Sequence, residues 1–412
     1  MWKFILKRVG QMVVLFYIFL ALLFLLLDLQ PGDISQQFVG NPDIPPEAKV
    51  LMVEQLGLDQ PKHIQLWNHL KNYSTFEMGA SWSQYPRQVS DIILSALPRT
   101  VFLFLTATVL SYAVGFWTGK VVAWKRGSAT EKGVMGSSIF LYTVFYPWFA
   151  ILMLWFFAAY LKWFPVGKFV TLNFDTRPDI VNRLSDMLFS ISGSEAASGW
   201  TSSLAPDANT VFNQLFISLS AATVVLLIVR AIIKRTVGDP ATARRFNNAG
   251  FFAIALGLVI YWVLNPNGAW ALDMLWHSVI PILTLTLVNF AGTTLLTRTS
   301  MIETVSEDYI LTARAKGVPS RTIRDRHASR NALLPVTTSL VLALAAVIGG
   351  GILTESIFSW PGLGLTYLGA IGSEDIPLAM GALALLGVLS LLAHLIADIL
   401  YAFLDPRIRV QG

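Results

Sequence analysis

The sequence predicts an all-α, polytopic transmembrane helix bundle, and three observations support this fold class. Charged residues make up only 13% of the 412 residues, roughly half the ~25% share of an ordinary soluble domain. Apolar residues lie in uninterrupted runs of about 20, the length that an α-helix needs to cross ~30 Å of hydrocarbon. Lysine and arginine gather in alternate intervals between these runs. Together these features argue against a soluble protein with a single core.

The predicted bundle has about eight spans, six of them firm. The firm spans are the longest apolar runs, at 9–29, 97–119, 134–161, 278–297, 332–354 and 377–403. Two weaker runs lie at 211–229 and 249–264. The second weak run has only 16 residues, so that a short span and an interfacial segment both fit it.

The first run follows three basic residues, as the apolar part of a signal peptide does. It is longer than such an apolar part, and no small-residue cleavage site follows it. We therefore expect a retained first span.

Charge placement predicts the topology, because lysine and arginine in short loops are retained on the cytoplasmic side. With the N-terminus inside, the cytoplasmic segments hold 21 of the 30 basic residues and 7 of the 25 acidic ones. The outer segments then hold 8 basic and 16 acidic residues. Inverting the topology would invert this asymmetry. We therefore expect both termini in the cytoplasm.

Several kinds of chemistry have no support in the sequence. The chain has no cysteine, which excludes disulfides, thiolate metal sites and cysteine nucleophiles. The nearest match to the phosphate-binding pattern G-x-x-x-x-G-K-[ST], from Gly115 to Lys120, has one residue too few between its glycines. The five histidines show no metal-binding spacing. An ATP-driven process would need the ATPase of another chain.

One pair of ionisable residues lies inside an expected span. His394 and Asp398 share a helical face at i, i+4 spacing, where they could pair. Ionisable residues within membranes are costly and often functional, but a proton relay would need further members on neighbouring helices. We expect a structural pair or a placement near the membrane interface.

The polar segment 301–335 is the most informative part of the chain. Thr304 and Glu307 fit a capping box, which predicts a short helix from about 305 to 316. Gly317 can then take the left-handed conformation that ends a helix.

A second helix should follow directly. Pro319 cannot donate the next helical hydrogen bond, and Ser320 can cap a new helix that carries several arginines. The sequence therefore predicts a helix–turn–helix elbow outside the membrane.

The first helix of this elbow has a face of small residues. Ile310, Ala313 and Gly317 fall together on it, and we expect another protein's surface to approach it closely. Arg314 and Lys316 flank that face. Two interpretations remain open: a basic loop that touches lipid headgroups, and a docking lever that passes a partner's movement into the bundle.

The elbow resembles a known transporter element. The run DYILTARAKGVPSRTIRDRHASRNALLP, at 308–335, is similar to the cytoplasmic EAA-type loop of ABC importer permeases of the dipeptide/oligopeptide/nickel branch. Ala313 and Gly317 stand at its characteristic alanine and glycine, while Leu311 and Thr312 replace a glutamate and an alanine. Four further segments resemble landmarks of that branch in the same order: LQPGD at 29–33, LGLDQP at 56–61, FSWPGLG at 358–364 and LDPRIR at 404–409.

The resemblance implies a type I importer permease fold and a non-catalytic transmembrane subunit in a prokaryotic inner membrane. The chain would pair with a second homologous permease, rest on two cytoplasmic ATPase subunits that bind ATP and Mg, and receive substrate from an extracytoplasmic binding protein. It would itself bind no cofactor, metal or nucleic acid. The residues expected to couple ATPase movement to the bundle are Tyr309, Thr312, Ala313, Arg314, Ala315, Lys316 and Gly317.

The chain departs from that branch in two places. Permeases of this kind have six spans and lack the stretch 169–269, which we expect to be an insertion with two extra spans. The Ser-x-Pro pattern of the third span is replaced by FYPWF at 145–149. The expected organisation is an N-terminal span (1–29), an extracytoplasmic loop (30–96), the second and third spans (97–168), the insertion (169–269), and the core spans (270–412) with the coupling loop 298–331.

Short peptides are the expected substrate, with oligosaccharides and nickel chelates as alternatives within the same architecture. The alternative from another class is a secondary transporter or channel that works without an ATPase. Such proteins tend to show inverted repeats or intramembrane ionisable networks, and neither is evident here. An integral-membrane enzyme would need a cluster of acid, base, nucleophile or metal ligands, which the sequence does not show.

Overall fold

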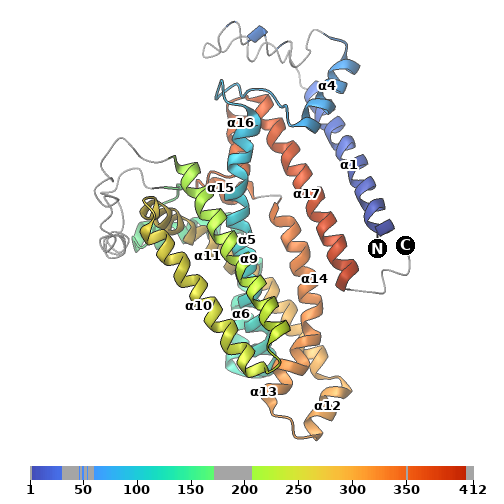
Figure 1. Cartoon of the computed structure of the whole chain (residues 1–412), viewed down its shortest axis with the longest axis vertical. Coiled ribbons are helices and arrows are strands. Elements are labelled where there is room, and N and C mark those ends of the chain that lie inside the picture. Colours follow the sequence, from blue (N-terminus) through green and yellow to red (C-terminus); the bar gives the residue numbers. More distant parts are fainter. Residues whose placement is uncertain are drawn as a thin grey trace. The chain divides into compact units, whose positions relative to one another are not determined.

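A computed structural model describes residues 2–29, 46, 49–50, 53, 60–170, 207–348 and 351–404. These residues form helices and no strand, which confirms the all-α class (Figure 1). The chain divides into two compact units. Unit 1 comprises Met1–Ala150, Pro281–Ile357 and Pro361–Gly412, and unit 2 comprises Ile151–Ile280 and Phe358–Trp360.

Six of the described helices are long and apolar enough to cross a membrane. They are α1 (Trp2–Asp28), α5 (Val89–Trp124), α9 (Ala208–Thr236), α10 (Pro240–Leu264), α11 (Gly268–Val305) and α17 (Ile376–Leu404). Both weaker runs of the sequence therefore form long helices. The polar residues 240–248 extend α10 beyond its apolar run, so that it is longer than the sequence suggested. The expected count of eight spans is not confirmed.

Two of the expected firm spans are interrupted. The run 134–161 is divided into α6 (Ala129–Thr143) and a second helix, α7 (Tyr146–Met153) with the π-helical turn η1 (Leu154–Tyr160), which meet at a bend of 110°. Pro147 lies in the first turn of α7 and cannot donate the hydrogen bond that would continue α6. The pair counts as a seventh span if it crosses as one.

The expected span 332–354 is likewise divided, between α14 (Ser329–Ile348) and α15 (Ile352–Ile357). The sequence has three consecutive glycines at 349–351, and glycine is the poorest helix former after proline. The expected helix around 47–56 lies largely outside the described residues.

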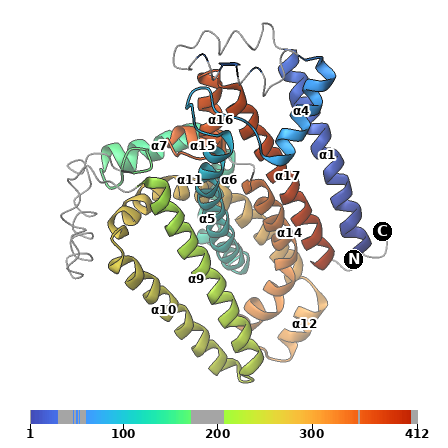
Figure 2. The ribbon, with the colours of Figure 1, turned by 45° about the horizontal axis from the view of Figure 1, so that its top comes forward.

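Within unit 1, α5 packs against α14, α17 and α16 (Leu363–Gly372). Helix α1 packs against α17 and against α4 (Lys62–Thr75), and Figures 1 and 2 show α1 running beside α17. The buried side chains between α5, α16 and α17 include Val89, Ile93, Leu363, Leu378 and Leu385. These apolar contacts hold the bundle together.

Helices α5 and α11 approach each other unusually closely. A Cβ atom on Gly115 would lie 2.7 Å from the Cβ of Thr293, and one on Gly119 would lie 2.6 Å from the Cβ of Thr297. Glycines four residues apart let two helix backbones meet in this way. The near match to a phosphate-binding pattern at Gly115 is therefore part of a helix–helix contact.

A buried carboxylate fixes the start of α16. Glu355 is 0% exposed and accepts hydrogen bonds from the Thr100 hydroxyl (2.7 Å) and from the backbone N–H of Leu365 (2.9 Å). A Cβ atom on Gly362 would lie 2.3 Å from Glu355 Oε1, so only glycine fits there. The carboxylate lies at the N-terminal end of α16, where the helix dipole favours negative charge.

The ionisable pair of the last helix does not form. Asp398 Oδ2 lies 3.3 Å from Nε of Arg8, which joins the end of α17 to the start of α1. His394 Nδ1 instead lies 2.7 Å from the Ser390 carbonyl oxygen of its own helix. The first of the two expected arrangements, a His394–Asp398 pair, is therefore wrong, because a basic residue of a neighbouring helix is the partner of Asp398. The placement near the membrane interface stays a prediction.

Unit 2 contains a helical hairpin of α9 and α10. The Trp262 indole N–H donates to the Ser218 hydroxyl (3.0 Å), and the Asn267 amide donates to Gln214 Oε1 (3.1 Å). The most apolar stretch of each helix contains no buried residue, as expected of surfaces that face lipid. Unit 2 extends well beyond 169–269, and residues 171–206 lie outside the described part, so the boundaries of the insertion stay a prediction.

Candidate functional site

The predicted elbow is present between α11 and α14. Helix α11 ends at Val305, a two-residue break follows, and α12 occupies Asp308–Ala315. The predicted capping box is wrong, because the Thr304 hydroxyl donates to the Ser300 carbonyl oxygen (2.7 Å) inside α11. Glu307 is the N-terminal cap residue of α12, and its side chain makes no capping bond.

Gly317 ends α12 as predicted. Its φ of +73° is in the left-handed region, which glycine adopts without strain. The backbone N–H of Val318 donates to the Ala313 carbonyl oxygen (3.1 Å), and that of Gly317 donates to the Arg314 carbonyl oxygen (2.9 Å). These two bonds form a Schellman motif, and Val318 packs against the apolar cluster that contains Ala313, a contact that often accompanies this motif.

The second limb of the elbow runs directly into a long helix. It begins with α13 (Ser320–Thr322) and continues through the π-helical turn η6 (Ile323–Ala328) into α14. Ser320 is the first helical residue rather than the cap, which is Pro319. The start of this helix near Ser320 was predicted correctly, but the prediction that Ser320 caps it was wrong.

The small face of α12 packs against the chain itself. Ile310 is fully buried and Ala313 is 8% exposed, and both contact a cluster with Met301, Ile323 and Ala328. The expectation that a partner approaches this face closely is therefore wrong. The elbow needs an apolar core of its own, because so short a helix is not stable in water without packing.

A partner could contact the opposite face of α12. Among the predicted coupling residues, all except Ala313 are exposed: Tyr309, Thr312, Arg314, Ala315, Lys316 and Gly317. Leu311 is 54% exposed on the same face, and Ala315 lies one turn beyond it. Leu311 was not among the predicted coupling residues. Its position between the buried residues 310 and 313 indicates that it lies on the exposed face of the helix.

Charged side chains tie the elbow to the end of α5. Asp325 accepts two hydrogen bonds from the Arg324 guanidinium (2.9 Å each) and lies 3.1 Å from the Lys120 ammonium. The Arg324 bonds, helped by Lys120, lower the pKa of Asp325 to about 2. The Arg314 guanidinium lies 6.0 Å from the centre of the Trp124 ring, also at the end of α5.

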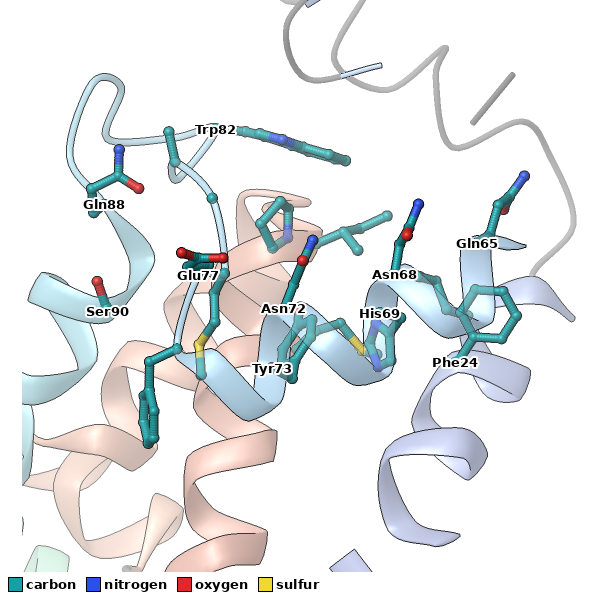
Figure 3. Close-up of a pocket in the computed structure, with 18 of the residues that line it drawn as sticks. Phe24, Gln65, Asn68, His69, Asn72, Tyr73, Glu77, Trp82, Gln88 and Ser90 are labelled. Atoms are coloured by element: carbon teal, nitrogen blue, oxygen red, sulfur yellow. The ribbon is translucent and has the colours of Figure 1, made fainter. Parts of the chain in front are cut away.

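A pocket of about 560 Å³ lies at the other end of unit 1, where α1, α4 and α17 meet the segment 76–90 (Figure 3). The amide side chains of Gln65, Asn68 and Asn72 line it from one face of α4, and Trp82 and Glu77 lie on the following segment. Hydrogen-bonding groups beside apolar side chains are typical of small-molecule sites. The three amides are spaced at i, i+3 and i+7 along the sequence, which is the signal that places them on one face of a helix.

His69 lies in the wall of this pocket and is the basis of a pH prediction. Its ring is 4.3 Å from that of Tyr73, and burial lowers its pKa from 6.5 to about 4. Between these two pKa values, the unfolded chain therefore carries a proton on His69 that the folded chain lacks. The contribution of the neutral His69 ring to the free energy of unfolding should be fully present above pH 6.5. It should be lost as the pH falls through about 4.

The measurement is the thermal unfolding midpoint of the detergent-solubilised protein across this pH range. We expect the midpoint of the wild type to fall more steeply than that of His69→Gln. The control is His63→Gln, an exposed histidine of the same helix, which should leave the slope unchanged. Identical slopes for His69→Gln and the wild type would contradict the prediction.

Comparisons with known proteins match nearly the whole chain. The family described as "Binding-protein-dependent transport system inner membrane component" matches residues 111–410, and its N-terminal counterpart matches residues 1–104. The chain is 28% identical over 411 residues to the di/tripeptide transport system permease protein DppB of Pseudomonas aeruginosa, with 100% of both chains covered. It is 28% identical over 410 residues to the dipeptide transport system permease protein DppB of Escherichia coli K12, covering 99% of both. It is 26% identical over 385 residues to the oligopeptide transport system permease protein AppB of Bacillus subtilis, covering 93% of this chain and 92% of that one.

Proposed function

The chain belongs to the family of binding-protein-dependent transport system inner membrane components, and on this premise we propose that it is the permease subunit of an ATP-driven peptide importer. The elbow is the observation that supports ATP-driven transport. One face of it is exposed and open to an ATPase subunit, and its buried core joins α11 to α14. The peptide substrate is supported by the relatives, which are named as permeases for dipeptides, tripeptides and oligopeptides.

The proposed assembly has four kinds of component. This chain pairs with a second homologous permease, two ATPase subunits supply the ATP and Mg sites, and an extracytoplasmic protein delivers the peptide. The elbow and both termini lie in the cytoplasm, which is supported by the excess of basic residues in the segments on that side. The described part of the segment 169–269 contributes the helices α9 and α10.

The exposed face of α12 is the proposed contact with an ATPase subunit. Leu311 and Ala315 offer a small apolar surface, and Lys316 adds positive charge at its edge. Closure of the ATPase pair on ATP moves α12, and the buried cluster around Ile310 moves the end of α11 with it. Asp325 and Lys120 pass the same displacement to α5.

Purification of the intact membrane complex through a tag on this chain tests the proposal. Mass spectrometry is expected to find stoichiometric subunits that carry a phosphate-binding loop, together with a bound peptide. An assembly without a nucleotide-hydrolysing subunit would favour a secondary transporter or channel. A bound oligosaccharide or nickel chelate would overturn the peptide assignment and leave the ATP-driven architecture standing.

One variant tests the contact face. Leu311→Glu replaces an exposed apolar contact with a charge. We expect retention of the ATPase subunits to fall about tenfold, a change of ~1.4 kcal/mol, because an unpaired carboxylate would be removed from water in the contact. Ser320→Glu is the matched control, because Ser320 is also exposed but lies on the other limb of the elbow. Equal retention in both variants would contradict the proposed face.

A further inference from the structure

A second groove lies within unit 1, among α5, α6, α11 and α14. Its volume is about 790 Å³. Hydroxyl and amide groups line it from all four helices, and none of its lining residues is charged. Its polar groups include Ser111 and Tyr112 of α5, Tyr142 of α6, Asn289 of α11 and Ser339 of α14.

These polar groups lie far from the ends of long apolar helices. Asn289 lies near the middle of the helix Gly268–Val305, and its side chain is exposed. A polar side chain at membrane depth is costly unless it faces protein or a water-filled cavity. Other faces of α5 expose apolar residues instead, among them Leu105 and Val109. The groove therefore combines hydroxyl and amide groups with apolar side chains such as Phe104 and Leu285, whereas the other faces of α5 have the composition of surfaces that meet lipid.

The groove walls are tied together. The Tyr112 hydroxyl lies 2.7 Å from the Ser339 hydroxyl, which joins α5 to α14, and the Thr118 hydroxyl lies 3.0 Å from that of Thr294, which joins α5 to α11. The polar lining is thus shared by helices that also carry the elbow at their ends. A displacement of the elbow would reach this lining directly.

Resting on the proposed function, we propose that this groove is this chain's share of the translocation path and binds the main chain of a peptide. Hydroxyl groups and the Asn289 amide both donate and accept hydrogen bonds, and a peptide main chain presents one donor and one acceptor at nearly every residue. Because the lining carries no charge, it does not select among peptides by the charge of their side chains.

Thiol accessibility tests the location of the path independently of transport. The chain has no cysteine, so a single introduced thiol gives a clean signal in the complete transporter reconstituted in liposomes. We expect a membrane-impermeant, water-soluble maleimide to label Asn289→Cys much faster than Val109→Cys, which exposes an apolar position of α5. A transported dipeptide should slow the labelling of Asn289→Cys. Equal labelling of the two variants would overturn the proposal.

Charge substitution tests the binding chemistry. Asn289→Asp should raise the uptake of lysine-containing peptides relative to neutral ones about fivefold, the factor expected when two unit charges approach to ~4 Å in water. Asn289→Lys should shift the ratio by a similar factor towards peptides that contain glutamate. Uptake ratios that stay unchanged in both variants would overturn the peptide contact.

The outcomes separate this inference from the proposed function. Peptide uptake by the wild type together with slow, unprotected labelling of Asn289→Cys would leave the importer in place and overturn the groove as its path. Fast labelling that no peptide slows, in a transporter that takes up another solute, would overturn the peptide assignment and leave the water-filled path.

Discussion

Gly119→Leu is expected to prevent the accumulation of folded protein in membranes. A Cβ atom at this position would lie 2.6 Å from the Cβ of Thr297 and 2.8 Å from the backbone oxygen of Thr294. A backbone oxygen within a helix cannot turn away as a side chain can, so α5 and α11 would have to separate. Overpacking of a well-filled contact costs about 1–3 kcal/mol or more, and the leucine also removes the close contact of the two backbones.

The measurement is the amount of monodisperse protein after detergent extraction, with its thermal unfolding midpoint. Gly136→Leu is the matched control, because Gly136 also lies within a helix and a Cβ atom there would meet nothing within 4 Å. Leucine is a better helix former than glycine by roughly 1 kcal/mol, so this control should be neutral or stabilising. Normal yield of Gly119→Leu would show that the two helices can move apart without cost.

Ala313→Glu is expected to abolish coupled transport. The side chain would enter the buried cluster around Ile310 and Met301, where an unpaired carboxylate costs several kcal/mol. We therefore expect the first limb of the elbow to come away from α11, with uptake below about a tenth of the wild-type rate and ATP hydrolysis no longer dependent on substrate.

Ala315→Glu separates this effect from a change of the contact surface. Ala315 lies two residues further along the same helix and is exposed, so the elbow should stay folded and resist limited proteolysis near residue 317. Ala313→Glu should be cleaved there readily. Equal protease resistance of the two variants would contradict the buried role of Ala313.

The elbow shows which features local sequence rules can predict. The left-handed end of α12 followed from a glycine two residues before a proline, and the structure places Gly317 at a φ of +73°. The capping box failed, because Thr304 could equally bond within the preceding helix, and only the length of α11 decides between the two. The helix face was assigned to a partner because sequence alone does not show that the second limb folds back onto it.

The membrane helices show a similar division. Length and hydropathy located the long helices, but not the bend of 110° between α6 and α7, since the apolar run continues across it. The polar groove was not predicted either. Its groups come from four helices that are far apart in the sequence, between Thr108 and Ser339. Spacing within one helix, such as that of Asn289 and Thr293, does not show that the four helices share a groove.

Helix α12 is joined to both of its neighbouring helices by short non-helical links. Residues 306–307 separate it from α11, and residues 316–319 separate it from the helical stretch 320–348. A force on α12 therefore has no continuous helix to follow, and it reaches α11 and α14 together through the buried cluster that contains Met301, Ile310 and Ala332. The packing of this cluster, rather than the stiffness of either helix, would set how much of a displacement of α12 reaches the bundle.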